Sequence, residues 1–272
     1  MNLTVHIEGQ GFPILCLHGH PGSGRSLSVF TNHLSNRFQT IAPDLRGYGR
    51  SRASGNFEMI EHLDDLEALL GSLNIDNYLV LGWSLGGILA LELALRHSQR
   101  VKGLILIATA ARPRGSHPPI GNLDLFYTGV AGILNLMKPG WEWNIETFGK
   151  RSLLRYLISQ QTALAYSYLA SQGTPAYLQT SKFANQALSQ ALKTRYNRLA
   201  ELHKITVPSL VLAGAEDRHI TADSSRETAE YLPNSQWKCY PNTAHLFPWE
   251  IPHQVLSDID SWLESTPIRA TG

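Results

Sequence analysis

The feature that most constrains this chain is a short apolar run that leads into the motif Gly82–Gly86, which reads GWSLG. Residues 79–81 predict a buried strand, and the leucine-rich residues 88–95 predict a helix that starts directly after the motif. Small residues at both ends of G-x-S-x-G let a strand turn sharply into a helix, which lifts the serine hydroxyl above the carboxyl edge of a sheet. The segment therefore predicts an α/β architecture with Ser84 as a nucleophile.

Other apolar runs repeat this pattern along the chain. Each is short and bounded by turn residues, as expected for strands covered on both faces. The expected strands are Ile14–Leu17, Gln39–Ala42, Tyr78–Gly82, Gly103–Ala108, Pro208–Gly214 and Gln236–Tyr240. Residues with helical spacing lie between them, at 59–70 and 222–232, and a last helix carries apolar residues at 255–263. This alternation predicts a mostly parallel, twisted sheet flanked by helices.

The alternation stops between Arg112 and Leu202, where the chain is mainly helical and interrupted by prolines. We expect a core domain formed by residues 1–111 and 203–272, with residues 112–202 inserted as a helical cap, or lid. No charged residue occurs between Arg155 and Lys182. This stretch fits both a helical pair packed on the core and a lid whose inner face lines an apolar substrate pocket.

A serine hydroxyl needs a base to take its proton, and the base needs a carboxylate to orient it. His245 follows the last expected strand, and Asp217 follows the strand before it. Both loops are expected to open at the same sheet edge as Ser84, in the chain order Ser, Asp, His of this type of fold. The nearest rivals are Glu216 and His219, but Glu216 would have to point the other way and His219 is too close in sequence to Asp217. We therefore expect His245 as base and Asp217 as its orienting acid.

The segment His18–Gly22 follows the first expected strand and is rich in glycine, so its backbone can approach a substrate closely. We assign the two oxyanion-stabilising N–H groups to the backbones of His20 and Leu85. Two histidines in this segment also suggest a metal, but no Asp-His partner follows at ligand spacing. Gly22-Ser23-Gly24 lacks the lysine of a phosphate-binding loop. We expect no metal and no cofactor.

Composition excludes several classes of function. The 23 basic and 22 acidic residues give a net charge of +1. This balance indicates neither a nucleic-acid-binding protein nor a polybasic patch for membranes. Residues 1–10 lack the features of a signal peptide, and residues 79–95 fit a strand, turn and helix better than a membrane span. Cys16 and Cys239 lie in apolar runs and are expected to be buried thiols. A cytoplasmic protein is expected, and the sequence does not predict its oligomeric state.

These motifs together resemble the α/β-hydrolase superfamily over almost the whole chain. The residues that carry the resemblance are His18–Gly22, Asp44–Ser51, the Gly82–Gly86 motif, Asp217 and His245. The Asp44–Ser51 segment looks like that of epoxide hydrolases and haloalkane dehalogenases, but those families have aspartate where this chain has Ser84. Their alkyl-enzyme mechanism is therefore not expected here.

The Gly82–Gly87 segment is also similar to that of the carboxylesterases that demethylate pimeloyl-acyl-carrier-protein methyl ester, although their oxyanion segment reads differently after His-Gly. Lys150, Arg151 and Arg155 fit either a patch for an acidic carrier protein or an ordinary solvated helix face. The expected function is hydrolysis of a carboxylic ester of a small or medium, apolar acyl substrate. A lactonase, a thioesterase, a carbon–carbon bond hydrolase and a small-molecule sensor with little turnover stay open as alternatives, since fold and triad do not choose among them.

Overall fold

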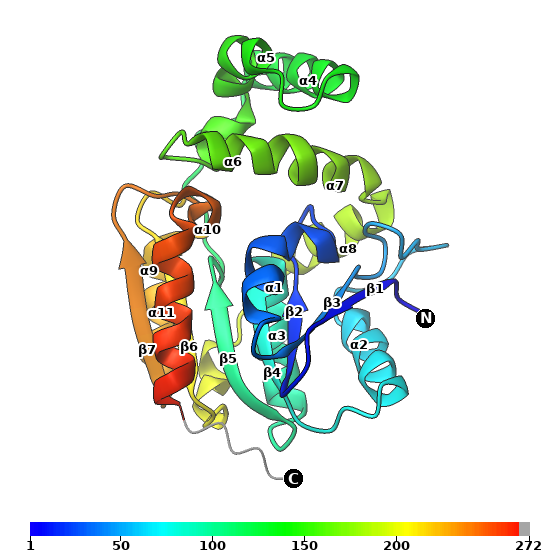
Figure 1. Cartoon of the computed structure of the whole chain (residues 1–272), viewed down its shortest axis with the longest axis vertical. Helices are drawn as coiled ribbons and strands as arrows, with labels where there is room; N and C mark the ends of the chain where they lie inside the picture. The colour runs from blue at the N-terminus through cyan, green and yellow to red at the C-terminus, as the bar shows by residue number, and fades with distance from the viewer. Residues whose placement is uncertain (267–272) are drawn as a thin grey trace.

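The computed structural model describes residues 1–266, and its centre is a seven-stranded sheet in the order β1-β3-β2-β4-β5-β6-β7 (Figure 1). The strands are β1 (Val5–Glu8), β2 (Pro13–Leu17), β3 (Gln39–Pro43), β4 (Tyr78–Trp83), β5 (Val101–Ile107), β6 (Ser209–Gly214) and β7 (Ser235–Tyr240). β1 pairs antiparallel with β3, and every other neighbouring pair is parallel. The mostly parallel sheet is confirmed. The sequence analysis missed β1, because it is a four-residue edge strand with only partial burial.

Helices cover both faces of the sheet, and each face has its own apolar core. The helices outside residues 112–202 are η1 (Gly24–Leu27), α1 (Ser28–Leu34), α2 (Glu61–Ser72), α3 (Leu85–Arg96), α9 (Ala222–Tyr231), α10 (Phe247–Glu250) and α11 (Pro252–Ser265). Side chains of α2 and α3 belong to one core, and those of α1 and α11 belong to the other. β4 is the fourth of the seven strands across the sheet, and all six of its residues are buried. The residues after it therefore emerge at the middle of the carboxyl edge.

Residues 112–202, called the insertion below, lie between β5 and β6 and contain only helices and loops. They form α4 (Asn122–Met137), α5 (Glu142–Thr147), η2 (Gly149–Arg151), η3 (Leu153–Tyr156), α6 (Ala163–Tyr168), η4 (Leu169–Gly173), α7 (Thr174–Gln179), α8 (Lys182–Lys193) and the start of η5 (Leu199–Lys204). Figure 1 shows α6 and α7 passing above the carboxyl ends of the strands, with α4 and α5 beyond them at the far end of the molecule.

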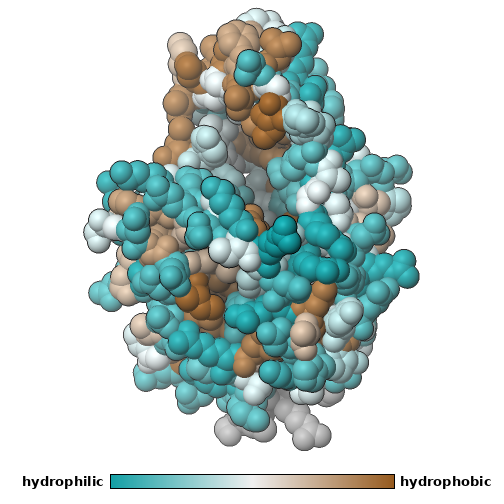
Figure 2. All heavy atoms as spheres, turned by 180° about the vertical axis from the view of Figure 1, so that it is seen from behind, coloured by the Kyte–Doolittle hydropathy of each residue, from teal (hydrophilic) through white to brown (hydrophobic). Residues whose placement is uncertain are grey.

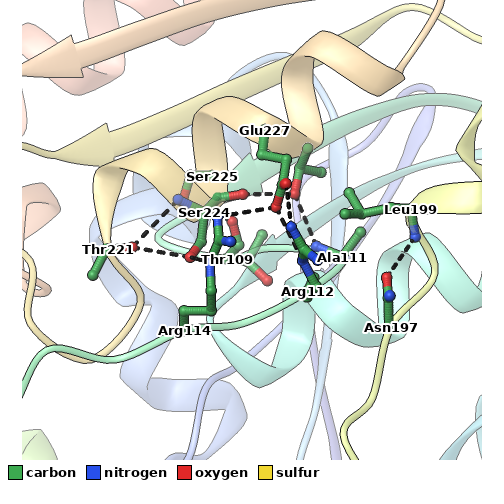
Figure 3. Close-up of polar contacts among 11 residues, drawn as sticks. Thr109, Ala111, Arg112, Arg114, Asn197, Leu199, Thr221, Ser224, Ser225 and Glu227 are labelled. Carbon is green, nitrogen blue, oxygen red and sulfur yellow. Dashed lines mark hydrogen bonds and ion pairs between the residues drawn. The ribbon is translucent and has the colours of Figure 1, made fainter.

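Hydrogen bonds and ion pairs fasten the start of the insertion to α9 (Figure 3). The Ser225 hydroxyl donates to the Thr109 carbonyl over 2.8 Å. Arg112 and Arg114 both pair with Glu227, which lies on α9. The chain therefore leaves the core at a fixed point.

The two cysteines differ from each other in burial. Cys16 is fully buried in β2, and burial raises the pKa of its thiol to about 12. Cys239 is exposed, so the expectation of a buried thiol is wrong at this position. It lies on β7, the last strand in the order of the sheet that residues 1–266 form.

Candidate active site

Ser84 occupies a strained turn between β4 and α3. Its backbone has φ 55° and ψ −116°, a conformation that costs free energy and that only well-fixed surroundings maintain. The Ser84 N–H donates to the Ile107 carbonyl over 2.9 Å, and the Thr109 hydroxyl donates to the Ser84 carbonyl over 2.8 Å. A Cβ atom at Gly86 would lie 2.0 Å from the Leu17 carbonyl oxygen, so this position of the motif needs glycine. The turn is therefore held between the ends of β2 and β5.

Asp217 and His245 form a buried pair at the same edge of the sheet. Nδ1 of His245 lies 2.7 Å from Oδ2 of Asp217, and their side chains are 6% and 0% exposed. The other carboxylate oxygen, Oδ1, accepts the backbone N–H groups of His219 and Ile220 at 2.8 Å and 3.1 Å. With Nδ1–H donated to the carboxylate, Nε2 of His245 is left as the proton acceptor. The loop geometry thus orients the acid, and the acid orients the imidazole.

Two contacts bring this pair and the His18–Gly22 segment to the serine turn. The Trp83 ring centroid lies 5.6 Å from that of His245. A Cβ atom at Gly19 would lie 3.1 Å from Cβ of Ser84 and 2.8 Å from the Trp83 ring. Segments far apart in the sequence therefore meet around Ser84, as their positions after parallel strands predict.

His219, the rival base, takes a different position. Its ring centroid is 5.1 Å from that of His245, and its Nδ1 lies 2.6 Å from Nε2 of His117 at the start of the insertion. The residue is exposed, but desolvation where its ring packs on the protein, together with the charges of His245 and His117, lowers the pKa of His219. Oδ2 of Asp217 bonds His245 rather than His219. The rival acid Glu216 has an exposed side chain.

The two histidines of the His18–Gly22 segment have protein partners. Nδ1 of His18 donates to the Gly19 carbonyl at 2.8 Å, and Nε2 accepts the Leu45 N–H at 3.1 Å. Nδ1 of His20 lies 2.9 Å from the Tyr48 hydroxyl. Burial lowers the pKa of both histidines to about 4, so both are neutral near pH 7. Their side chains brace the segment whose backbone approaches Ser84.

Asp44, the first residue of the Asp44–Ser51 segment, connects two loops next to this site. Its Oδ1 accepts the Gly24 N–H and its Oδ2 accepts the Arg50 N–H, both at 2.8 Å. The carboxylate therefore joins two loops near the His18–Gly22 segment, which is a structural role.

Glu250 is a buried carboxylate beside the site that the sequence analysis missed. It accepts the backbone N–H groups of Ala244, Ser159 and Gln160. Burial raises the pKa of Glu250, with the nearby charge of Asp217 adding to the effect. Glu250 thus connects the loop of His245 to the insertion. Its closeness to His245 in the chain was the only sequence signal.

The uncharged stretch of the insertion packs on the core near His245. The Tyr168 ring of α6 stacks on Trp249 with centroids 4.0 Å apart, and Trp249 is 2% exposed. The contact fits the helical pair packed on the core, and it gives Trp249 a packing role between the core and α6.

Two of the three basic residues considered for a carrier protein are paired within the insertion. Lys150 contacts Glu146 at 2.6 Å, and Arg155 contacts Asp124 at 2.8 Å. This leaves less free positive charge than the sequence suggested.

The fold and these motifs place the chain in a known class. Residues 13–252 match the model of the alpha/beta hydrolase fold family, and the chain belongs to this family. It is a hydrolase of that family.

Individual relatives are distant but cover most of the chain. The pimeloyl-[acyl-carrier protein] methyl ester esterase of Chromobacterium violaceum is 30% identical, over 90% of this chain and 91% of its own. The 2-hydroxymuconate semialdehyde hydrolase of Pseudomonas putida is 26% identical, over 89% of this chain and 83% of its own. Among solved structures, a thermophilic esterase from Thermogutta terrifontis is 26% identical with a TM-score of 0.71, covering 96% of this chain and 93% of its own.

Proposed function

We propose that this protein is a serine esterase in which Ser84, His245 and Asp217 form the catalytic triad. The observation that carries the proposal is the buried 2.7 Å pair of His245 and Asp217, located beside the strained serine turn. A buried imidazole that is oriented by a carboxylate is the base that a serine hydroxyl needs. The esterases among the relatives support the same reaction class.

The proposed reaction has two halves. Ser84 Oγ attacks the ester carbonyl carbon while Nε2 of His245 takes the hydroxyl proton, and the negative charge on the carbonyl oxygen is stabilised by the N–H groups of His20 and Leu85. His245 then gives its proton to the leaving alcohol, and an acyl-Ser84 ester remains. Water, deprotonated by His245, attacks this ester, releases the acid and returns the proton to Ser84.

Asp217 acts through His245 in both halves. Its Oδ2 holds the tautomer with the proton on Nδ1 and stabilises the imidazolium that forms when Nε2 accepts a proton. The N–H groups on its Oδ1 fix the carboxylate and compensate its burial. No step of this sequence requires a metal or a cofactor.

We infer a small or medium apolar acyl substrate, with the insertion acting as a cap over the site. The uncharged stretch between Arg155 and Lys182 supports this, because it brings no charge to the helices that pass above the strand ends. A free carboxylate or phosphate on the acyl chain would find no oppositely charged side chain in this stretch.

The test is steady-state hydrolysis of p-nitrophenyl esters from acetate to decanoate, with the Ser84→Ala variant run in parallel. The proposal expects many turnovers per enzyme for the parent, none above background for the variant, and a best chain length that reports the acyl pocket. Parallel assays with a lactone, a thioester and a ring-cleavage diketone separate the esterase from other hydrolases of this family. Binding with a large rise in melting temperature but no turnover on any substrate would instead indicate a sensor.

A further inference from the structure

Helix α4 of the insertion turns its polar side toward the protein. Asp124, Thr128, Ala131 and Asn135 follow one another at spacings of four, three and four residues, so they share one face of the helix. Asp124, Ala131 and Asn135 are buried, at 7%, 7% and 8% exposure. An ordinary surface helix buries its apolar stripe instead.

Specific polar contacts hold this face in place. Oδ1 of Asp124 pairs with Arg155 at 2.8 Å. The side-chain amide of Asn135 donates to the Ala170 carbonyl at 2.9 Å, and its Oδ1 accepts the Gly140 N–H at 3.0 Å. Each buried polar group therefore has a partner, which fixes the orientation of α4.

The opposite face of α4 is apolar and exposed. Figure 2 shows apolar surface gathered at this end of the molecule. The exposed residues of this face are Leu123 (70%), Leu125 (54%), Phe126 (59%), Ile133 (63%), Leu136 (60%) and Met137 (78%). A continuous apolar surface of this kind on an otherwise polar protein marks an interaction site.

Aromatic and charged side chains follow α4 in the chain. Lys138 directly follows α4, and its Nζ lies 5.5 Å from the ring centroid of Trp141. Trp143 is 51% exposed and packs against Trp141 at 4.9 Å. Lys138 and the exposed Arg151 have no ion-pair partner among residues 1–266, and neither has the exposed Glu142 between the two tryptophans. Tryptophan and long cationic side chains around an apolar surface are typical of proteins at the headgroup level of a membrane.

We propose that the outward face of α4 docks on the surface of a lipid membrane, with Lys138 and Arg151 next to the lipid phosphates. An apolar helix face that ends at an unpaired lysine and two tryptophans complements a bilayer, which supplies an apolar interior and phosphates for the lysine. The position of α4 at the far end of the molecule lets a flat surface reach it without meeting the core (Figure 1).

The mode of contact follows from the length of the helix. None of the helices in residues 1–266 is both long and apolar enough to cross a membrane. α4 has 16 residues and one polar face, so it would lie in the plane of the interface. This surface lies outside the serine site, and the inference does not depend on the proposed esterase reaction.

The experiment is sedimentation of the full chain with vesicles of phosphatidylcholine, alone and mixed with phosphatidylglycerol. The probe variant replaces Leu125, Phe126 and Met137 by Gln. The matched control replaces exposed apolar residues elsewhere, Ile7, Leu192 and Tyr231, by Gln. We expect the partition coefficient of the probe variant to fall about 10-fold or more, because three apolar side chains no longer enter the bilayer, and that of the control to equal the parent.

A second variant, Lys138→Gln with Arg151→Gln, tests the charge. It should lose affinity for the mixed vesicles and keep its affinity for phosphatidylcholine alone. Thermal unfolding of all variants verifies that they fold, as expected for exposed positions.

Three results would overturn the proposal. The first is a parent that sediments with neither vesicle, and the second is a probe variant that binds both as well as the parent. The third is a parent that forms a dimer by light scattering, which the probe variant converts to monomer, without vesicle binding. The face of α4 would then belong to a second copy of the chain.

Discussion

Helices α11 and α4 distribute their side chains in opposite ways. α11 buries Val255, Ile259 and Trp262 against the sheet, at 0%, 0% and 2% exposure. α4 buries Asp124 and Asn135 and exposes Leu123, Leu136 and Met137. Both helices have one polar and one apolar side, but they place those sides in opposite directions.

The difference shows that two kinds of interaction hold the two regions. The hydrophobic effect orients α11, since each side chain removed from water adds stability. Paired polar groups orient α4, and its apolar face gains nothing from the fold itself. The apolar side of α11 is therefore buried within the chain itself, whereas the apolar face of α4 becomes buried only when a further apolar partner covers it.

Replacing Ser84 by Ala should have the largest effect. It tests whether ester hydrolysis at the core and membrane binding by α4 are independent of each other. The nucleophile is lost, so ester turnover should fall by about 10⁴-fold or more, while vesicle binding through α4 stays at the parent level. Ser72→Ala, on the exposed end of α2, is the control. Turnover of the Ser84 variant near that of the parent would contradict the proposed reaction.

Truncating one aromatic side chain in each of the two helices compares directly how much each contributes to the free energy of unfolding. Trp262→Ala removes a buried side chain of α11 and should lower the free energy of unfolding by about 3–5 kcal/mol. Phe126→Ala on α4, which is 59% exposed, should change it by no more than about 0.5 kcal/mol. Urea unfolding followed by circular dichroism gives both values. Similar losses for the two variants would mean that the α4 face is packed in solution.

Glu250→Gln tests the connection between the two regions. The amide can replace only one carboxylate oxygen as acceptor, so either the Ala244 N–H or the N–H groups of Ser159 and Gln160 lose their partner, at a cost of about 1–3 kcal/mol. Because Glu250 also holds the loop of His245, we expect kcat to fall and KM to change little.

The exposed Glu264→Gln is the matched control, and the readout is kcat and KM against pH. A Glu250 variant with lower stability but an unchanged pH profile and kcat would show a structural role alone.

Lowering the pH tests the stability of the core, because several of its histidines are buried. Burial lowers the pKa of His62 to about 3 and those of His18 and His20 to about 4, against about 6.5 in an unfolded chain. Below pH about 6.5 the unfolded state therefore binds more protons than the folded state. The stability that the neutral buried histidines contribute is complete above pH about 6.5 and is lost progressively as the pH falls through about 4.

His62→Gln should reduce the slope of unfolding free energy against pH by up to about 1.4 kcal/mol per pH unit in this window. The exposed His253→Gln should leave the slope unchanged. Equal slopes for the parent and the His62 variant would show that His62 is protonated in the native state.

The sequence by itself determined much of the fold. The expected strand positions agree with β2 to β7 within about two residues, because buried parallel strands are short apolar runs with clear ends. Ser84, Asp217 and His245 each follow a strand, and the carboxyl ends of parallel strands meet at one edge. Chain order was therefore enough to predict that these residues lie close together.

Only the tertiary structure decided the contacts that depend on packing partners. β1 is an edge strand with weak patterning, and Cys239 is exposed because β7 is the last strand of the sheet. Glu250 is defined by N–H groups about 90 residues away in the chain. The direction in which α4 faces depends on Arg155 and Ala170, which no local pattern reveals. Periodicity shows that a helix has two sides, but only the neighbours determine which side is inside.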